Sequence, residues 1–333
     1  MSWANIFGHD ANVAQLRTAF ERGRLAHAYL FIGPSGIGKK LFAREFAKAL
    51  LCEAPPAPLT ACDHCPACKQ VEIGSHPDFF YACKPADKSE LVIETVREFA
   101  DHLGTKAVRG KRKVGLLDDA DFINSASANS LLKTLEEPPE GTVLILLATT
   151  EESQLPTILS RSQKMRFSAL KTNDLLRVLK RLELGKEEHL QRLAALGGGS
   201  VEQAVALDSE GVLAFRDAML KGLGDARPDT VGLTARWHTF NEEAGKDAKL
   251  RRPRAVAVIR LLTDFLRVAL AQSLGDDSPG DAKRLAAHVG PEGIAEMMES
   301  CIEAERLILG YAQLELVVEQ LMDRLTVRPA AIR

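Results

Sequence analysis

The sequence predicts an α/β protein whose first half forms a parallel sheet and whose second half is entirely helical. Apolar segments with strand character alternate with amphipathic segments in the first half, an order typical of parallel sheets. From Asn173 onward only helical spacing of apolar residues is found. The length of 333 residues indicates two or three domains. We therefore expect a sheet domain at residues 1–168, a small helical unit at 169–208 and a further helical domain at 209–333.

A glycine-rich loop joins the first predicted strand to the first long helix. LAHAYLFIG (residues 25–33) has the character of a buried strand, and LFAREFAKALL (residues 41–51) has apolar residues at helical spacing. Between them, FIGPSGIGKK (residues 31–40) contains the G-x-x-x-x-G-K pattern of a phosphate-binding loop. Backbone N–H groups in such a loop and at the following helix N-terminus bind phosphate. The residues that carry this prediction are Gly33, Gly36, Gly38 and Lys39.

Two positions in this predicted nucleotide site depart from the pattern of an ATPase. A loop that binds Mg²⁺ has Ser or Thr after its lysine, and here that residue is Lys40. The second strand, KVGLLDDAD (residues 113–121), ends in Asp118, which suits a magnesium-binding carboxylate. The next residue, where a Glu would orient the attacking water, is Asp119, one methylene shorter. We therefore expect weak ATP or ADP binding at most, little use of Mg²⁺ and poor or absent hydrolysis.

The third strand is preceded by a helix that two prolines end. SASANSLLKTLEEPP (residues 125–139) has helical character up to its Pro-Pro pair, and we interpret Glu136 and Glu137 as the solvated end of this helix. TVLILLATT (residues 142–150) is the third strand and ends at Thr150. In a parallel sheet the functional groups lie at the carboxyl ends of the strands. The glycine loop, Asp118 and Thr150 should therefore share one edge.

Four of the six cysteines lie in a short insertion after the first long helix. They are Cys52, Cys62, Cys65 and Cys68, the last three spaced as C-x₂-C-x₂-C. Four thiolates without an open position are typical of a structural zinc site, and free buried cysteines are an improbable alternative at this density. We predict a zinc module at residues 52–68, with His64 and His76 as substitute ligands.

Charge and hydropathy indicate which kinds of partner the protein can bind and in which cellular compartment it is expected. A net charge of −2 gives no overall footprint for nucleic acid, so any DNA contact would need a local patch. The densest basic run, VRGKRKV (residues 108–114), either contacts a phosphate backbone or, as is more common, forms a solvated turn. The N-terminus lacks the features of a signal peptide, and no apolar run is long enough to span a membrane. We therefore expect a cytoplasmic protein.

An arginine flanked by serines follows the third strand. PTILSRS (residues 156–162) places Arg161 near the end of a short helical segment. Such an arginine is either an ordinary surface residue or one presented to a neighbouring subunit. The second reading has a physical basis, because a guanidinium supplied in trans stabilises the charge on a transferring phosphoryl group.

Together these segments resemble the bacterial clamp-loader family of AAA+ proteins. LAHAYLFIGPSGIGKK, the cysteine knuckle, HPDF, LLDDADFINSASANSLLKTLEEPPEGT and PTILSRS carry the resemblance, which is dense to about residue 168 and weaker beyond. It implies an AAA+ domain, a helical lid and an all-α collar through which five subunits assemble. It also implies a role in loading the sliding clamp of DNA polymerase III onto primed DNA. An ordinary helical domain of a monomer is the alternative reading of the second half.

The resemblance assigns roles to single residues. The four cysteines match the zinc ligands of the family, and the glycine loop with Asp118 and Asp119 matches its nucleotide site. Thr150 matches a polar residue that senses the terminal phosphate, and Arg161 matches the arginine that reaches the ATP of the adjacent subunit. Members that hydrolyse ATP have an arginine at the position of Glu202 in the lid. These departures favour a helper subunit over a catalytic loader ATPase or a zinc-stabilised kinase.

Overall fold

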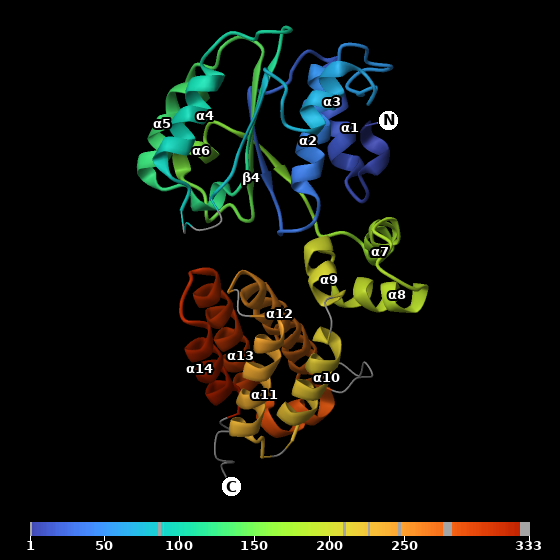
Figure 1. Ribbon diagram of the computed structural model, residues 1–333, viewed down its shortest axis with the longest axis vertical. Helices are drawn as coiled ribbons and strands as arrows, with labels where there is room; N and C mark the ends of the chain where they lie inside the picture. Colours follow the sequence, from blue (N-terminus) through green and yellow to red (C-terminus); the bar gives the residue numbers. More distant parts are fainter. Residues whose placement is uncertain are drawn as a thin grey trace. The chain divides into compact units, whose positions relative to one another are not determined.

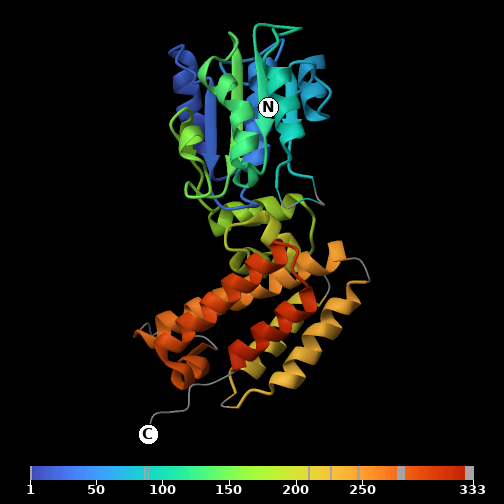
Figure 2. The same cartoon turned by 90° about the vertical axis from the view of Figure 1, so that its left-hand side faces the viewer.

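The computed structural model of the chain divides into two compact units, residues 1–202 and residues 203–333, and each is described here by itself (Figures 1 and 2). The described residues are 2–85, 88, 90–208, 211–225, 227–245, 248–275 and 282–326. The final residues of the predicted domain at 209–333, from 327 onward, lie outside the described residues.

The first unit is built on a five-stranded parallel sheet with the strand order β2-β3-β4-β1-β5. The strands are β1 (Ala28–Ile32), β2 (Phe79–Ala82), β3 (Lys113–Leu117), β4 (Thr142–Ala148) and β5 (Gln163–Arg166). The α/β prediction is confirmed, and the three strands expected from the sequence are β1, β3 and β4. The sequence reading did not identify β2 and β5, which form the two edges of the sheet.

Helices cover both faces of this sheet. The helical elements of the unit are η1 (Ser2–Asn5), α1 (Asp10–Glu21), α2 (Lys39–Leu51), α3 (Pro66–Glu72), α4 (Ile93–Leu103), η2 (Ala120–Phe122), α5 (Ser125–Glu136), α6 (Pro156–Leu159), α7 (Thr172–Arg181) and α8 (Glu187–Leu196). Figure 1 shows α1, α2 and α3 on one side of the sheet and α4, α5 and α6 on the other. Because side chains alternate along a strand, Phe31 packs with α2 in one core while Leu30 packs with α4 and α5 in the other.

The glycine loop lies directly between β1 and α2, as the motif predicts. Gly36 and Gly38 have φ values of 71° and 99°, a region that glycine enters without steric cost. The loop is also packed against the start of α9, because the Val201 N–H donates to Gly36 O at 2.8 Å. A Cβ atom at Gly36 would lie 2.2 Å from Ser200 Oγ and 2.5 Å from Glu202 Cβ, so only glycine fits there.

The second unit is helical throughout its described residues. Its elements are most of α9 (Val201–Asp208), α10 (Val212–Leu223), α11 (Thr230–Glu243), α12 (Ala248–Ser273), α13 (Ala282–Leu309) and α14 (Leu314–Thr326). Two of these helices bury apolar residues at helical spacing: Val258, Leu261, Leu262 and Phe265 on α12, and Leu314, Val317, Val318, Leu321 and Leu325 on α14. The helix α12 packs along α13, and α14 packs against α11 and α13. Among the described helices, none is both long and apolar enough to cross a membrane.

Candidate functional site

A cavity of about 880 Å³ lies at the carboxyl edge of the sheet in the first unit. Of the predicted nucleotide-site residues, the structure brings Gly36, Gly38, Lys39, Lys40, Asp118 and Asp119 together in its lining. The lining also includes the apolar residues Ile6, Phe7, Leu170, Val178 and Leu182. The glycine loop and the charged groups of this lining suit a phosphate group, and its apolar residues suit a flat base.

Lys39 is held by the loop itself. Its ammonium donates hydrogen bonds to Gly33 O at 2.5 Å and to Pro34 O at 2.7 Å. Burial lowers the pKa of Lys39, and the carboxylates of Asp121 and Asp118 oppose that effect. The lysine is therefore placed at the phosphate end of the cavity, with its charge satisfied by loop carbonyls.

Lys40 points at the carboxylate that was expected to hold a metal. Its Nζ atom lies 3.3 Å from Asp118 Oδ2, donates to the Tyr81 hydroxyl and lies 4.3 Å from the centre of the Tyr81 ring. The Tyr81 hydroxyl donates in turn to Asp118 Oδ2 at 3.3 Å, and burial raises the pKa of Tyr81, which keeps the phenol protonated. The second oxygen of Asp118 accepts the N–H of Asp119 at 3.0 Å. Both oxygens of Asp118 therefore have protein partners.

Asp119 is turned toward the segment after β2. It has a left-handed backbone conformation, with a φ of 58°, and its Oδ2 atom accepts the backbone N–H of Lys84 at 3.3 Å. Burial raises the pKa of Asp119, and the neighbouring Asp118 raises it further. This carboxyl group fixes a loop, which is a poor arrangement for activating water.

Asp121 organises the turn after β4, and the sequence analysis gave it no role. Its two oxygens accept the Thr149 N–H at 2.8 and 3.0 Å, and its Oδ1 atom also accepts from Gln154 Nε2 at 3.0 Å and from the Ser153 hydroxyl. The cavity lining includes Thr149, whereas the hydroxyl of Thr150 accepts the Ser153 N–H at 3.3 Å. The third acidic residue of LLDDAD was the signal that could have indicated this role.

Arg161 lies outside the lining of this cavity, on the surface after α6. Its Nε and Nη2 atoms contact Glu136 Oε1 at 2.9 and 2.7 Å. Its Nη1 atom donates to Thr157 O at 3.2 Å and to Ser160 Oγ at 3.1 Å. The side chain is 35% exposed, so the guanidinium is both accessible and oriented. Glu136, interpreted from the sequence as a solvated helix end, is the carboxylate that orients it.

Glu202 stands at the start of α9 and lines the cavity beside the loop. Its backbone and Cβ atom are close to Gly36, as the short distances from a Cβ at that glycine indicate. The carboxylate therefore adds negative charge to the end of the cavity where phosphate would bind, and it acts on Lys39.

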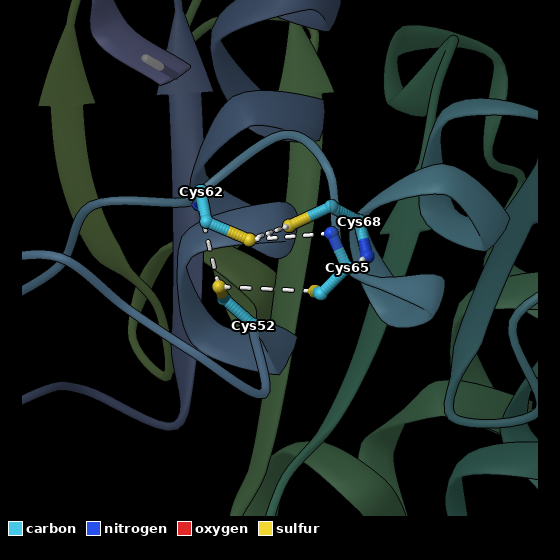
Figure 3. A group of neighbouring side chains, drawn as sticks. All are labelled: Cys52, Cys62, Cys65 and Cys68. Atoms are coloured by element: carbon cyan, nitrogen blue, oxygen red, sulfur yellow. Dashed lines mark hydrogen bonds between the residues drawn. The ribbon is translucent and has the colours of Figure 1, made fainter.

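The four predicted cysteines form one cluster, which could hold a metal ion (Figure 3). Their sulfur atoms all lie within 4.8 Å of one another, and the pairs Cys52–Cys65 and Cys62–Cys68 are each 4.0 Å apart. A tetrahedron with Zn–S bonds of about 2.3 Å has sulfur atoms about 3.8 Å apart, so the arrangement fits zinc without large movement. Burial opposes ionisation of Cys62, but N–H donors that include Cys65 lower its pKa to about 7.

The two histidines considered as substitute ligands lie elsewhere. His64 is exposed and its Nδ1 atom is 2.7 Å from Cys62 O, while His76 is buried and accepts the Asp78 N–H at 3.0 Å. Among the described residues, the cysteines alone make up the cluster.

The basic run at residues 108–114 has partners within the protein. Asp78 accepts the N–H groups of Val108 and Arg109 at 2.7 and 2.8 Å, which fixes the turn. The Arg112 guanidinium lies over the Phe20 ring, and Lys113 is buried. Residues 108–111 are exposed, in agreement with the interpretation as a solvated turn, whereas Lys113 already belongs to β3.

Comparison with known proteins identifies the family. Residues 8–171 match the profile of the family described as DNA polymerase III, delta subunit. The chain is 38% identical over 203 residues to DNA polymerase III subunit delta' of Pseudomonas aeruginosa, which is 61% of this chain and 62% of that protein. It is 33% identical to subunit tau of Escherichia coli over 73% of this chain and 36% of that protein. It is 27% identical to subunit delta' of Escherichia coli over 93% of this chain and 92% of that protein.

The match to the Pseudomonas protein thus spans less than two thirds of that relative, while the match to the Escherichia coli delta' protein spans nearly all of it. The matched region at residues 8–171 contains the glycine loop, the cysteine cluster and Arg161. On these grounds the chain belongs to the bacterial clamp-loader family of DNA polymerase III subunits.

Proposed function

We propose that this chain is a delta-prime-type subunit of a DNA polymerase III clamp loader, which supplies Arg161 to the nucleotide site of a neighbouring subunit and hydrolyses little or no ATP itself. One observation carries the proposal: Lys40 pairs with Asp118 in the cavity of the chain itself, whereas Arg161 lies partly exposed outside that cavity. Because Arg161 does not line the nucleotide cavity of its own chain, it is available to contact the nucleotide of a neighbouring subunit.

The proposed partners are gamma/tau-type and delta-type loader subunits in a hetero-pentamer. Residues 209–333 would form the helical collar and residues 169–208 the lid, with the sliding clamp and primed DNA engaged through the complex in the cytoplasm. Any DNA polymerase activity belongs to the holoenzyme as a whole. The cysteine cluster would hold structural zinc, because its four closely spaced thiolates can supply all four ligands of a tetrahedral ion.

The second candidate is a catalytic loader ATPase of the gamma/tau type, favoured by the match to the Escherichia coli tau subunit. Three features of the cavity oppose it. Lys40 replaces the hydroxyl that would bind Mg²⁺, Asp119 bonds the Lys84 N–H, and Glu202 adds negative charge beside the loop. These three features weaken metal binding, activation of water and triphosphate binding, respectively.

The test is reconstitution with gamma/tau and delta subunits of the same organism. We expect Arg161→Ala to leave assembly intact and to lower the ATPase rate of the complex. Lys164→Ala is the matched control, because this neighbouring surface lysine pairs with Glu151 at 2.9 Å and its loss should leave the rate unchanged. An unchanged rate with Arg161→Ala would remove the in-trans role. Steady ATP turnover by the isolated chain, abolished by Lys39→Ala, would favour the catalytic alternative.

A further inference from the structure

The strongest unexplained feature of the cavity is the set of contacts around Lys40. Its ammonium has Asp118 Oδ2 at 3.3 Å, the Tyr81 hydroxyl as a hydrogen-bond acceptor and the Tyr81 ring face at 4.3 Å. Tyr81 donates to the same Asp118 oxygen at 3.3 Å. Lys40 lies on α2, Tyr81 on β2 and Asp118 directly after β3. The sheet therefore supplies both groups that fix the ammonium.

These contacts do not fit the metal that the loop motif implies. Mg²⁺ demands near-octahedral oxygen ligands at about 2.0–2.1 Å and gives up its water reluctantly. Lys40 offers no acceptor atom, and its charge lies within hydrogen-bonding distance of the Asp118 oxygen that a metal would use. A divalent ion at that oxygen would have to displace the ammonium and would then repel it.

The neighbouring carboxylates offer no replacement site. Asp118 Oδ1 accepts the Asp119 N–H, and Asp119 Oδ2 accepts the Lys84 N–H. Both oxygens of Asp121 accept the Thr149 N–H. These oxygens face protein donors, and a metal ion would have to compete with each of them. Among Lys40 and these three aspartates, only Lys40 carries the positive charge that a metal would supply.

We propose that the Lys40 ammonium substitutes for the divalent cation in this cavity, so that Mg²⁺ adds nothing to the binding of a nucleoside diphosphate there. The inference deepens the proposed function and rests on its nucleotide cavity. We further infer that Asp118 can bind Mg²⁺ once the Lys40 ammonium is removed, because the remaining donor to its Oδ2 atom is the neutral Tyr81 hydroxyl. Replacing Lys40 with the hydroxyl residue of the motif should therefore create a magnesium-dependent nucleotide site.

The experiment measures binding of a fluorescent ADP to the isolated full chain, with Mg²⁺ and with a chelator in its place. Four proteins are compared: the unchanged chain, Lys40→Thr, Lys40→Met and the double variant Lys40→Thr with Asp118→Asn. The Met variant removes the cation without adding an oxygen ligand, and the double variant removes the carboxylate. Thermal unfolding of each protein checks that the fold is retained.

We expect the affinity of the unchanged chain to differ by less than about twofold between the two conditions. Lys40→Thr should bind ADP at least about tenfold more tightly with Mg²⁺ than with the chelator, because hydroxyl and carboxylate then share the ion. Lys40→Met and the double variant should show a smaller effect or none. A tenfold Mg²⁺ effect in the unchanged chain would overturn the proposal, and so would a folded Lys40→Thr variant without any Mg²⁺ effect. Neither result would bear on the proposal that Arg161 acts in trans, because the ATPase rate of the reconstituted complex tests that proposal separately.

Discussion

Replacing Lys48 should destabilise the first unit strongly, because this lysine joins α2 to α3 and to the cysteine-containing segment at residues 52–68. Its ammonium contacts Glu45 Oε1 at 2.7 Å, Glu72 Oε2 at 2.9 Å and Asp63 Oδ1 at 3.2 Å. Burial alone would lower the pKa of Lys48, but the hydrogen bonds to Glu45 and Glu72 outweigh it and raise the pKa above its ordinary value. Lys48 is therefore charged at neutral pH and holds three carboxylates together.

The magnitude follows from the burial of each partner. Asp63 and Glu72 are 33% and 48% exposed, so their ion pairs contribute about 0–1 kcal/mol each. Lys48 and Glu45 are only 8% and 2% exposed, and Glu45 Oε2 has no hydrogen-bond partner among the described residues. Removing one member of a buried pair costs about 3–5 kcal/mol, because the other charge is stranded. We therefore expect Lys48→Met to cost about 3–5 kcal/mol.

The assay is thermal unfolding at pH 8, where the carboxylates are ionised. At about 2–4 °C per kcal/mol for a unit of this size, the midpoint should fall by about 6–20 °C. Arg44→Met is the matched control, since Arg44 lies on the same helix and contacts the same Glu72 at 3.4 Å, but is 31% exposed. It should cost less than about 1 kcal/mol.

A double variant separates stranded charge from lost packing. Adding Glu45→Gln to Lys48→Met removes the buried carboxylate and should recover most of the stability. If Lys48→Met costs no more than Arg44→Met, or if Glu45→Gln gives no recovery, the assignment of a buried ion pair is refuted.

Three further predictions concern the metal, pH and the loop. Elemental analysis of reduced protein should find about one zinc per chain, and Cys65→Ser should lose it; metal-free unchanged protein would contradict the zinc assignment. Burial lowers the pKa of His9, whose Nε2 atom lies 2.9 Å from Ile37 O. As pH falls, His9 is therefore protonated in the unfolded chain before it is protonated in the folded chain. The stability that neutral His9 contributes is lost as pH falls below about 6.5. His9→Gln should flatten that pH dependence, and an unchanged slope in urea unfolding would show that other groups cause it. Gly36→Ala should lower the unfolding midpoint more than Gly38→Ala, because both have positive φ but only Gly36 faces Ser200 and Glu202; equal midpoints would show that this packing contributes nothing.

The central strands could be predicted because burial leaves a simple pattern. Every residue of β1, β3 and β4 is buried, so each strand forms a nearly continuous apolar run. The edge strand β5 exposes Gln163, Lys164 and Arg166 and buries only Met165, so its sequence resembles a polar loop. Its place in the sheet depends on backbone pairing with β1, which leaves no hydrophobic signal.

The cavity could be predicted in part, because its loop and carboxylates come from local motifs. The partners of those residues could not. Tyr81 and Lys40 are 41 residues apart, and they meet because β2 pairs with β3 and α2 contacts β3. Likewise, Glu136 reaches Arg161 only because the end of α5 lies near α6. Such contacts depend on tertiary packing, and spacing along the chain gives no indication of them.

The most direct test compares two variants in the reconstituted loader, Arg161→Ala and Lys39→Ala, by steady-state ATPase rate. An arginine supplied in trans is worth about 10³–10⁵ in rate at the site it serves, so Arg161→Ala should remove the contribution of the neighbouring site. Lys39→Ala should leave the total rate unchanged, because the cavity of this chain contributes no turnover. A rate that falls with Lys39→Ala and stays the same with Arg161→Ala would contradict the account.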